Sequence, residues 1–326
     1  MPERDAATAG LLPALGAYLV WGLSPVYFKA LSGVPPIEIL CHRVAWSVAL
    51  LAAAVALAGG FAELRRALGS RRARLTLGAT TVLISGNWLL YIWAVNSGHL
   101  LEASLGYFVN PLVNVLLGVV FLRESLSRAQ GLAVALAGAG VLWMVLSYGR
   151  FPWISLTLAT TFGLYGLLRK SAGVGALSGL FCETALLAPA ALLYLGLAAG
   201  AGSGAFGSGW RISLLLAAAG AITAVPLVWF AVAVRRLRLS TMGFLQYLAP
   251  SLQFALAVWL YREPFTRSHL TTFGFIWTSL GLYTWDAVRR LGSVEPPSVA
   301  TASRPSSRAG TRPAAARGRS GPPPRR

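Results

Sequence analysis

Charged residues are scarce in this chain of 326 residues. They make up 12% of it, whereas hydrophobic residues make up 56%. A soluble globular domain carries roughly 25% charged residues, so this shortage excludes an ordinary soluble domain and indicates that most of the chain lies in lipid. The formal net charge of +18 would suggest nucleic-acid binding, but much of it comes from an arginine-rich tail and from the ends of apolar segments. We therefore expect no nucleic-acid partner.

Cysteine and catalytic motifs are scarce as well. The two cysteines, Cys41 and Cys182, fall within apolar segments, where a small packing residue is the expected use of a free cysteine. The chain has no GxSxG nucleophile turn, HExxH zinc pair, phosphate-binding GxxxxGK[ST] loop or CxxC pair. We expect no enzyme activity, no cofactor, no metal and no nucleotide-binding segment.

Long apolar runs are what the chain has in abundance. Each is close to the ~20 residues that a helix rising 1.5 Å per residue needs to cross a ~30 Å hydrocarbon layer. The runs are continuous and do not alternate in polarity, which favours helices over barrel strands. We predict an all-α membrane protein with ten transmembrane helices. The expected spans are Leu11–Ala30, Ile37–Ala58, Leu75–Val95, Leu101–Phe121, Gln130–Ser147, Trp153–Leu168, Ala176–Ala199, Ile212–Val234, Ser240–Leu260 and Leu270–Val288.

A proline and a glutamate recur at the same spacing in the two halves of the chain. Pro111 and Glu124 are as far apart as Pro250 and Glu263, and the similar segments FLRES and LYREP surround the two glutamates. This agreement indicates an internal repeat. We expect each glutamate to form a helix-end ion pair with the arginine next to it.

A second pair of similar segments extends the repeat. WGLSPVYFK at 21–29 and FGLYGLLRK at 162–170 are offset by 141 residues, and the same offset carries Cys41 onto Cys182. Each unit then holds five spans, and because five is odd, the second unit must cross the membrane in the opposite sense. Inverted repeats are related by a pseudo-twofold axis in the membrane plane and hold a binding site between them at mid-depth.

Basic residues are concentrated in alternate loops, which predicts the orientation. The positive-inside bias puts both termini in the cytoplasm, in agreement with an even number of crossings. The loops expected inside carry Arg65, Arg66, Arg71, Arg72, Arg74, Arg123, Arg128, Arg169, Lys170, Arg235, Arg236 and Arg238. The opposite loops carry Lys29, Arg150, Arg211, Arg262 and Arg267.

Three segments resemble a known family. They are PPIEILCHRVAWS at 35–47, GNWLLYIWAVNSGHLLEASLGYFVNPLVNVLLG at 86–118 and RLRLSTMGFLQYLAPSL at 236–252. The chain resembles the EamA-type transporters of the drug/metabolite transporter superfamily, and within them the RarD subfamily of bacterial inner-membrane permeases. This resemblance covers about residues 10 to 290. It implies a fold of five plus five inverted helices and a role in transport.

Four regions follow from the spans and the repeat. Residues 1–10 form a short cytoplasmic N-terminus, 11–149 the first five-helix repeat and 150–290 the second, inverted repeat. Residues 291–326 form a tail rich in Arg, Pro and Ser that we expect to be disordered on the cytoplasmic side. We predict a multi-pass protein of the bacterial inner membrane.

Ionisable groups inside the spans are the first candidates for the site, because each costs at least ~2.5 kcal/mol on insertion scales and needs a partner or a wet cavity. Glu38 and His42 lie four residues apart and share a helix face, next to Arg43. Arg43 could bind a substrate carboxylate or phosphate while Glu38 and His42 exchange protons. The alternative is an interfacial salt bridge that includes Lys29.

Glu183 is the candidate for proton coupling in the second repeat. It follows Cys182 as His42 follows Cys41, so the inverted copy has an acid where the first has an imidazole. The alternative is that Glu183 pairs internally with a basic side chain such as Arg169.

Polar and aromatic stripes are the third group of candidates. They could line a cavity with amide groups and aromatic walls, suited to a zwitterionic or amphipathic metabolite. The alternative is hydrogen bonding between helices and aromatic belts at the membrane interfaces. The residues are Asn87, Trp88, Tyr91 and Trp93; Tyr107, Asn110 and Asn114; Tyr165; and Gln246, Tyr247 and Gln253.

These observations favour a secondary-active transporter of small organic metabolites or drugs. It would work by alternating access, possess no obligate protein partner, and be driven by protons or by the solute gradient. A flippase or carrier of amphipathic lipid-linked molecules is the alternative, followed by a membrane-embedded enzyme.

Overall fold

The computed structural model describes residues 2–292 except 124, 149–150, 172–173, 235, 238–241 and 243–244. Helices account for all regular structure in this part of the chain. The tail predicted at 291–326 lies outside the described residues from 293 onward. The helices are α1 (Pro2–Ala30), α2 (Pro36–Leu57), α3 (Phe61–Leu68), α4 (Arg71–Asn96), α5 (Leu100–Leu122), α6 (Arg128–Tyr148), α7 (Trp153–Ser171), α8 (Ala176–Gly200), α9 (Trp210–Val234), α11 (Leu248–Ala255), the π-helix η1 (Leu256–Leu260) and α12 (Arg267–Gly292).

Among the described residues, seven helices are long and apolar enough to cross a membrane. A helix satisfies all of its own backbone hydrogen bonds, which is what a segment in lipid requires. The seven are α1, α2, α4, α5, α6, α8 and α9. The three remaining predicted spans correspond to α7, to α11 with η1, and to α12. By length and composition alone, the prediction of an all-α membrane protein is thus confirmed, while the count of ten crossings stays a prediction.

The predicted span Ser240–Leu260 is not one regular helix. Its described part contains a turn at Gln246 and Tyr247, then α11, then the π-helix. Pro250 lies in the first turn of α11, where a residue without an N–H is tolerated. Its repeat equivalent, Pro111, lies inside the continuous helix α5. Matching prolines therefore occupy different helical positions.

The helix α3 was not expected from the apolar pattern. It is short, and its side chain Glu63 accepts hydrogen bonds from the Gly175 backbone N–H at 2.7 Å and from the Ser178 hydroxyl at 3.0 Å. These donors belong to the start of α8, where unpaired N–H groups and the helix dipole favour an acid. The segment between α2 and α4 is therefore folded against the second half of the chain.

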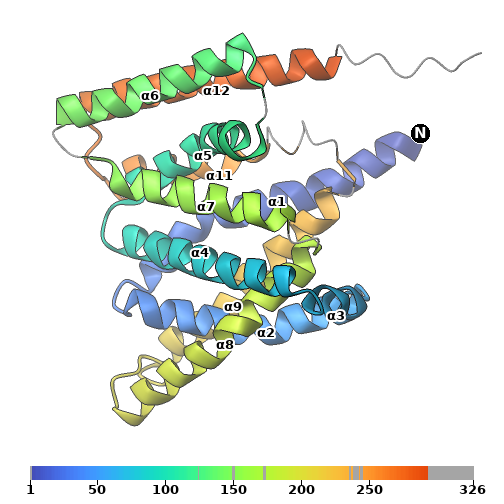
Figure 1. The fold of residues 1–326 in the computed structure, drawn as a ribbon. Coiled ribbons are helices and arrows are strands. Elements are labelled where there is room, and N and C mark those ends of the chain that lie inside the picture. Colours follow the sequence, from blue (N-terminus) through green and yellow to red (C-terminus); the bar gives the residue numbers. More distant parts are fainter. Residues whose placement is uncertain are drawn as a thin grey trace, which may run out of the picture.

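Helices from the first half of the chain pack in pairs against helices from the second half. In Figure 1, α6 and α12 run side by side along one edge, and α2, α8 and α9 lie toward the other edge. Between them, α1 packs against α9 and α11, and α7 packs against α4 and α5. If each of the first five predicted spans is matched with its counterpart among the last five, the contacts correspond: α1 with α9 matches α7 with α4, and α1 with α11 matches α7 with α5.

The two sides of the bundle carry different segments. The start of α1, the helix α3 and the end of α12 lie on the right in Figure 1, and we call this the N-terminal side. The loops 31–35, 97–99 and 201–209 lie on the left, which we call the far side. The two ends of the described chain are thus on one side, as an even number of crossings requires.

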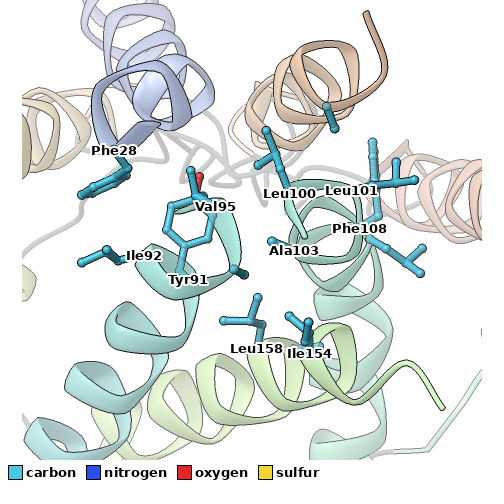
Figure 2. Close-up of a cluster of buried hydrophobic side chains, with 14 of the residues drawn as sticks. Phe28, Tyr91, Ile92, Val95, Leu100, Leu101, Ala103, Phe108, Ile154 and Leu158 are labelled. Atoms are coloured by element: carbon cyan, nitrogen blue, oxygen red, sulfur yellow. The ribbon is translucent and has the colours of Figure 1, made fainter. Parts of the chain in front are cut away.

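The main core cluster extends through the bundle and includes residues of α1, α4, α5 and α7. Figure 2 shows Phe28 beside Tyr91, and Phe108 on the other side of α5, where its ring meets the Phe273 ring of α12 edge-on. The ring of Phe28 meets the ring of Tyr91 edge-on, with 6.0 Å between centroids. Because protein interiors are close-packed and have few voids, these contacts hold the Tyr91 ring in place.

The ends of α5 and η1 share one backbone feature, while the repeat of five spans stays a prediction. Arg123 and Arg262, which correspond in FLRES and LYREP, both have φ of 55°, a left-handed conformation that caps a helix end. The expected ion pair at Glu263 was wrong. Its two carboxylate oxygens accept the backbone N–H groups of Leu100, at 2.9 Å, and Leu101, at 2.7 Å, and so cap α5. Glu124 lies outside the described residues.

Candidate substrate-binding site

Arg43 joins three helices from both halves of the chain. It lies about 10 Å along α2 from the start of that helix, at 1.5 Å per residue, and its side chain is half-buried. Its Nε donates a hydrogen bond of 2.8 Å to the Thr223 hydroxyl on α9. Its guanidinium carbon lies 4.1 Å from the centre of the Trp88 ring on α4, which is a cation–π contact.

Three tyrosines complete the surroundings of Arg43. Tyr27, Tyr91 and Tyr107 are the tyrosines near enough to its guanidinium for their hydroxyls to affect its charge. The rings of Tyr91 and Tyr107 meet edge-on at 5.6 Å, and the Tyr27 hydroxyl donates to the Leu215 carbonyl on α9 at 2.8 Å. We call the group of Tyr27, Arg43, Trp88, Tyr91, Tyr107 and Thr223 the arginine–aromatic cluster.

Arg43 has no acidic partner in the part of the chain that the structure describes. No carboxylate oxygen there lies within 4.0 Å of its nitrogen atoms, and its hydrogen bonding to described residues is limited to Thr223. Lys29, the candidate partner in the alternative of an interfacial salt bridge, forms no salt bridge with a described residue: its amino group lies 5.3 Å from the centre of the Tyr261 ring. The two terminal amino groups of Arg43 therefore remain available as donors.

Glu38 and His42 share a helix face, as their spacing predicts, but they bind a loop. A Glu38 carboxylate oxygen accepts the Ala205 backbone N–H at 2.6 Å and lies 3.9 Å from His42 Nε2. The His42 ring stacks on Phe206 at 5.2 Å. Glu38 is only 2% exposed. These two side chains thus hold the loop 201–209 against α2.

Glu183 is paired internally, as the alternative to proton coupling proposed. It is 1% exposed and accepts hydrogen bonds from the hydroxyls of Thr80, at 2.7 Å, and Tyr165, at 3.1 Å. Arg169 Nε lies 3.6 Å from the same carboxylate. Tyr165 is therefore brought to this acid and not to Arg43. A proton-coupling role for Glu183 stays a prediction.

Room for Arg169 comes from a glycine on α8. A Cβ atom at Gly179 would overlap the terminal nitrogen atoms of the Arg169 guanidinium. Arg169 also donates to the Gly175 carbonyl at 2.9 Å. Gly179 thus lets the guanidinium cross the helix surface and reach Glu183.

The asparagine stripe bonds helices together. The Asn87 amide donates to the Leu158 carbonyl at 3.0 Å, and the Asn110 amide donates to the Ala159 carbonyl, also at 3.0 Å. The Asn114 amide donates to Asn110 Oδ1 at 3.1 Å. The first two bonds fix α4 and α5 on α7, as the helix-bonding alternative expects, and the third lies within α5.

The remaining predicted residues make contacts elsewhere. The Gln253 amide donates to the Trp21 carbonyl at 3.2 Å. The Tyr247 ring stacks on Phe108 at 6.5 Å, and Gln246 is half-buried in the turn before α11. Trp93 stacks on the His99 ring at 5.3 Å near the far side. The arginine–aromatic cluster therefore retains four of the candidate residues, Arg43, Trp88, Tyr91 and Tyr107.

Sequence reasoning missed two members of the cluster. Tyr27 lies in the repeated segment at 21–29, but nothing in the pattern separates it from the aromatic residues of an interface belt. Thr223 is a single hydroxyl in the apolar run of α9, where threonine commonly bonds to its own helix, and it does donate to the Ala219 carbonyl at 2.8 Å. Only the packing of α9 on α2 shows its second role.

A separate hollow of about 350 Å³ lies at the rim of the far side, between the α4–α5 and α6–α7 connections. It is outside the arginine–aromatic cluster and shares no residue with it. Its lining consists of His99, Glu102, Met144, Phe151, Pro152, Trp153 and Ile154.

The long apolar helices and the polar groups packed between them define a multi-pass membrane protein. Residues 8–146 match the EamA-like transporter family. The chain is 46% identical over 289 residues to an uncharacterized transporter of Vibrio cholerae, covering 88% of this chain and 96% of the relative. It is 46% identical over 280 residues to the protein RarD of Escherichia coli, covering 86% and 95%. The chain belongs to the EamA-like transporter family, in its RarD subfamily.

Two further comparisons extend this result. The uncharacterized transporter YojE of Bacillus subtilis is 42% identical over 287 residues, covering 86% of this chain and 95% of the relative. A solved crystal structure superposes with a TM-score of 0.53 at 19% identity, covering 86% of this chain and 99% of that chain. At this identity the superposition supports the fold alone.

Proposed function

We propose that the chain is a secondary-active transporter that moves small organic metabolites or drugs across the bacterial inner membrane by alternating access. The observation that carries the proposal is Arg43, a guanidinium within a predicted span that has free hydrogen-bond donors and no carboxylate beside it among the described residues. A charge at membrane depth is costly and marks a functional site when its partner is absent. The arginine–aromatic cluster is the proposed binding site.

Alternating access further requires two halves that can rock about the site. Two observations support ten crossings arranged as inverted repeats: the exchanged packing of α1 on α11 and of α7 on α5, and the matching left-handed caps at Arg123 and Arg262. Arg43 bonds to α9 and contacts α4, so the cluster takes residues from both halves, as a site between repeats does.

The N-terminal side is proposed to face the cytoplasm. The segment from α3 to the start of α4 lies on that side and carries a dense group of arginines, whereas the far side has isolated cations such as Lys29 and Arg211. The positive-inside bias favours this orientation.

Proton coupling is proposed to act through the two acids that tie the halves together. Glu183 on α8 accepts from Thr80 on α4, and Glu38 on α2 accepts from Ala205 in the α8–α9 loop. A carboxylate accepts such bonds more strongly than a protonated acid does. Protonation of either acid would therefore loosen a contact between the halves, with His42 beside Glu38 as a second proton carrier.

The experiment has two stages. Metabolite profiles of cells with and without the protein identify solutes whose distribution changes, and flux of those solutes is then measured in proteoliposomes with and without a proton gradient. The proposal expects flux that Arg43→Gln reduces at least tenfold. The matched control is Arg211→Gln, because Arg211 also lies near a tryptophan, 5.4 Å from the Trp210 ring, but is exposed. Absence of solute flux in every condition would contradict the proposal.

A further inference from the structure

We infer that the arginine–aromatic cluster selects a singly charged organic anion with a flat apolar body, such as an aromatic monocarboxylate, over neutral, cationic and doubly charged solutes. This inference rests on the proposed function and names the substrate class of the same site. It is carried by three observations: the charge balance at Arg43, the donors that Arg43 has free, and the rings that surround it.

Charge balance limits the ligand to one negative charge. The Arg43 guanidinium is positively charged at neutral pH, and no carboxylate of the described chain lies within 4.0 Å of it. The amino group of Lys29 is engaged over the Tyr261 ring. A monoanion neutralises the site, whereas a dianion leaves one charge uncompensated in a medium of low dielectric constant, and a cation is repelled.

The free donors of Arg43 favour a carboxylate. Nε is already bonded to Thr223, so a ligand meets the end of the guanidinium where the two terminal amino groups project. Two parallel N–H groups match the two oxygens of a carboxylate in a bidentate pair, which adds geometric selectivity to the attraction of charge. A phosphate monoester carries about −1.5 to −2 charge at neutral pH and is disfavoured by the charge balance.

The rings around Arg43 favour a flat apolar body. Trp88 covers one face of the guanidinium at 4.1 Å. Tyr91 and Tyr107 are set at 68° to each other with centroids 5.6 Å apart, and Tyr107 meets the Phe162 ring edge-on at 6.3 Å. Aromatic rings prefer offset or edge-to-face neighbours, so a ligand ring beside the carboxylate gains contacts that an aliphatic chain of equal length does not.

The test measures binding to the full-length protein in lipid nanodiscs by calorimetry, with probes that share one ring. They are phenylacetate, its methyl ester, phenethylamine and phenyl phosphate. Phenylacetate is expected to bind at least tenfold more tightly than each of the other three. Equal binding of the ester or the amine would overturn the inference, because neither can form the bidentate ion pair.

Variants locate the effect in the cluster. Arg43→Gln is expected to lower the affinity for phenylacetate at least tenfold, and Arg43→Lys, which keeps the charge but loses the fork, to lower it less. Acetate is added here as a probe without a ring. Tyr107→Leu removes a ring from the cluster and is expected to lower the ratio of phenylacetate affinity to acetate affinity. Arg211→Gln is the control and should bind as the parent does. Each variant is checked for monodispersity and thermal midpoint, and unchanged phenylacetate binding by a folded Arg43→Gln protein would overturn the inference.

The same preparations separate this inference from the proposed function. Flux of a neutral or cationic solute that depends on Arg43, with no phenylacetate binding, overturns the substrate class and leaves the transporter in place. Binding of phenylacetate that depends on Arg43, with no flux of any solute in proteoliposomes, overturns the transporter and leaves a binding site for monoanions.

Discussion

The second helix of each repeat, α2 in the first and α8 in the second, handles buried charge in a different way. On α8, the acid Glu183 is met by Arg169 from α7, and two hydroxyls satisfy its remaining lone pairs. On α2, Arg43 meets aromatic rings and one hydroxyl, while the nearby acid Glu38 faces away to a loop. The charge on α8 is thus neutralised within the protein, which we call a closed ion pair. The Arg43 charge on α2 has no acidic partner among the described residues, which we call an open cation.

The predicted repeat offset of 141 identifies the positions that differ. Arg169 corresponds to Phe28, and Gly179 corresponds to Glu38. In the second copy the cation therefore comes from the preceding helix and crosses α8 where glycine leaves space. In the first copy the equivalent position holds a buried core ring. If the two segments are copies of one unit, as the predicted repeat states, a few side-chain differences account for a paired acid on α8 and an Arg43 without an acidic partner among the described residues on α2.

The largest effect is expected from Arg169→Gln. It leaves the buried Glu183 carboxylate without its cation, and breaking a buried pair in this way costs about 3–5 kcal/mol. Thermal or denaturant unfolding in detergent measures the loss. Arg43→Gln is the matched change on α2 and should cost under about 1 kcal/mol, because it strands no acid. Equal losses for the two variants would remove the distinction between a closed pair and an open cation.

Removing both partners of the pair sharpens the comparison. The double variant Arg169→Gln with Glu183→Gln replaces the charges by neutral amides, so it should regain about 2 kcal/mol or more relative to Arg169→Gln alone. The measurement is a double-mutant cycle of unfolding free energies. Additive losses would show that Arg169 and Glu183 are not energetically coupled.

Gly179→Ala tests the space that admits Arg169. The new methyl group must displace the guanidinium, and overpacking of this kind costs about 1–3 kcal/mol. The control is Gly196→Ala on the same helix, where a Cβ would have nothing within 4 Å and the change should be neutral or slightly stabilising. The thermal midpoints of the two variants are compared. A Gly179→Ala protein as stable as the parent would show that the Arg169 guanidinium does not need the space at Gly179.

The smallest effect is expected at the loop held by α2. Glu38→Gln keeps an acceptor for the Ala205 N–H but loses the charge, so about 1 kcal/mol of local stability should be lost. Hydrogen exchange should become faster at Ala205 and its neighbours in the loop 201–209, while α8 keeps its protection. Unchanged exchange in that loop would mean that the Glu38 carboxylate does not restrain it.

The local part of this architecture could be read from the sequence. Apolar run lengths predicted the seven helices suited to a membrane, the FLRES and LYREP segments predicted a repeat that shares backbone geometry at Arg123 and Arg262, and a spacing of four predicted that Glu38 and His42 share a face. Pro250 shows the limit of such predictions. It matches Pro111 in sequence, but Pro111 lies inside a continuous helix, so the match did not predict the turn before α11.

The candidate site could be predicted only in part. Arg43, Trp88 and Tyr107 were identifiable as polar or aromatic groups at membrane depth. The asparagines have the same appearance in sequence, yet Asn87 and Asn110 bond to the backbone of α7. The difference depends on which helix lies opposite, and spacing along one helix contains no information on that.

The sequence by itself determined that the chain lies in a membrane as helices and which ionisable groups fall within the apolar runs, because hydropathy and helical period are properties of single segments. Only the tertiary structure decided which charges are neutralised. Arg169 reaches Glu183 from another helix, whereas Arg43 meets rings and a hydroxyl, and in a medium of low dielectric constant the partner across the helix interface determines whether a charge is paired or open to a ligand.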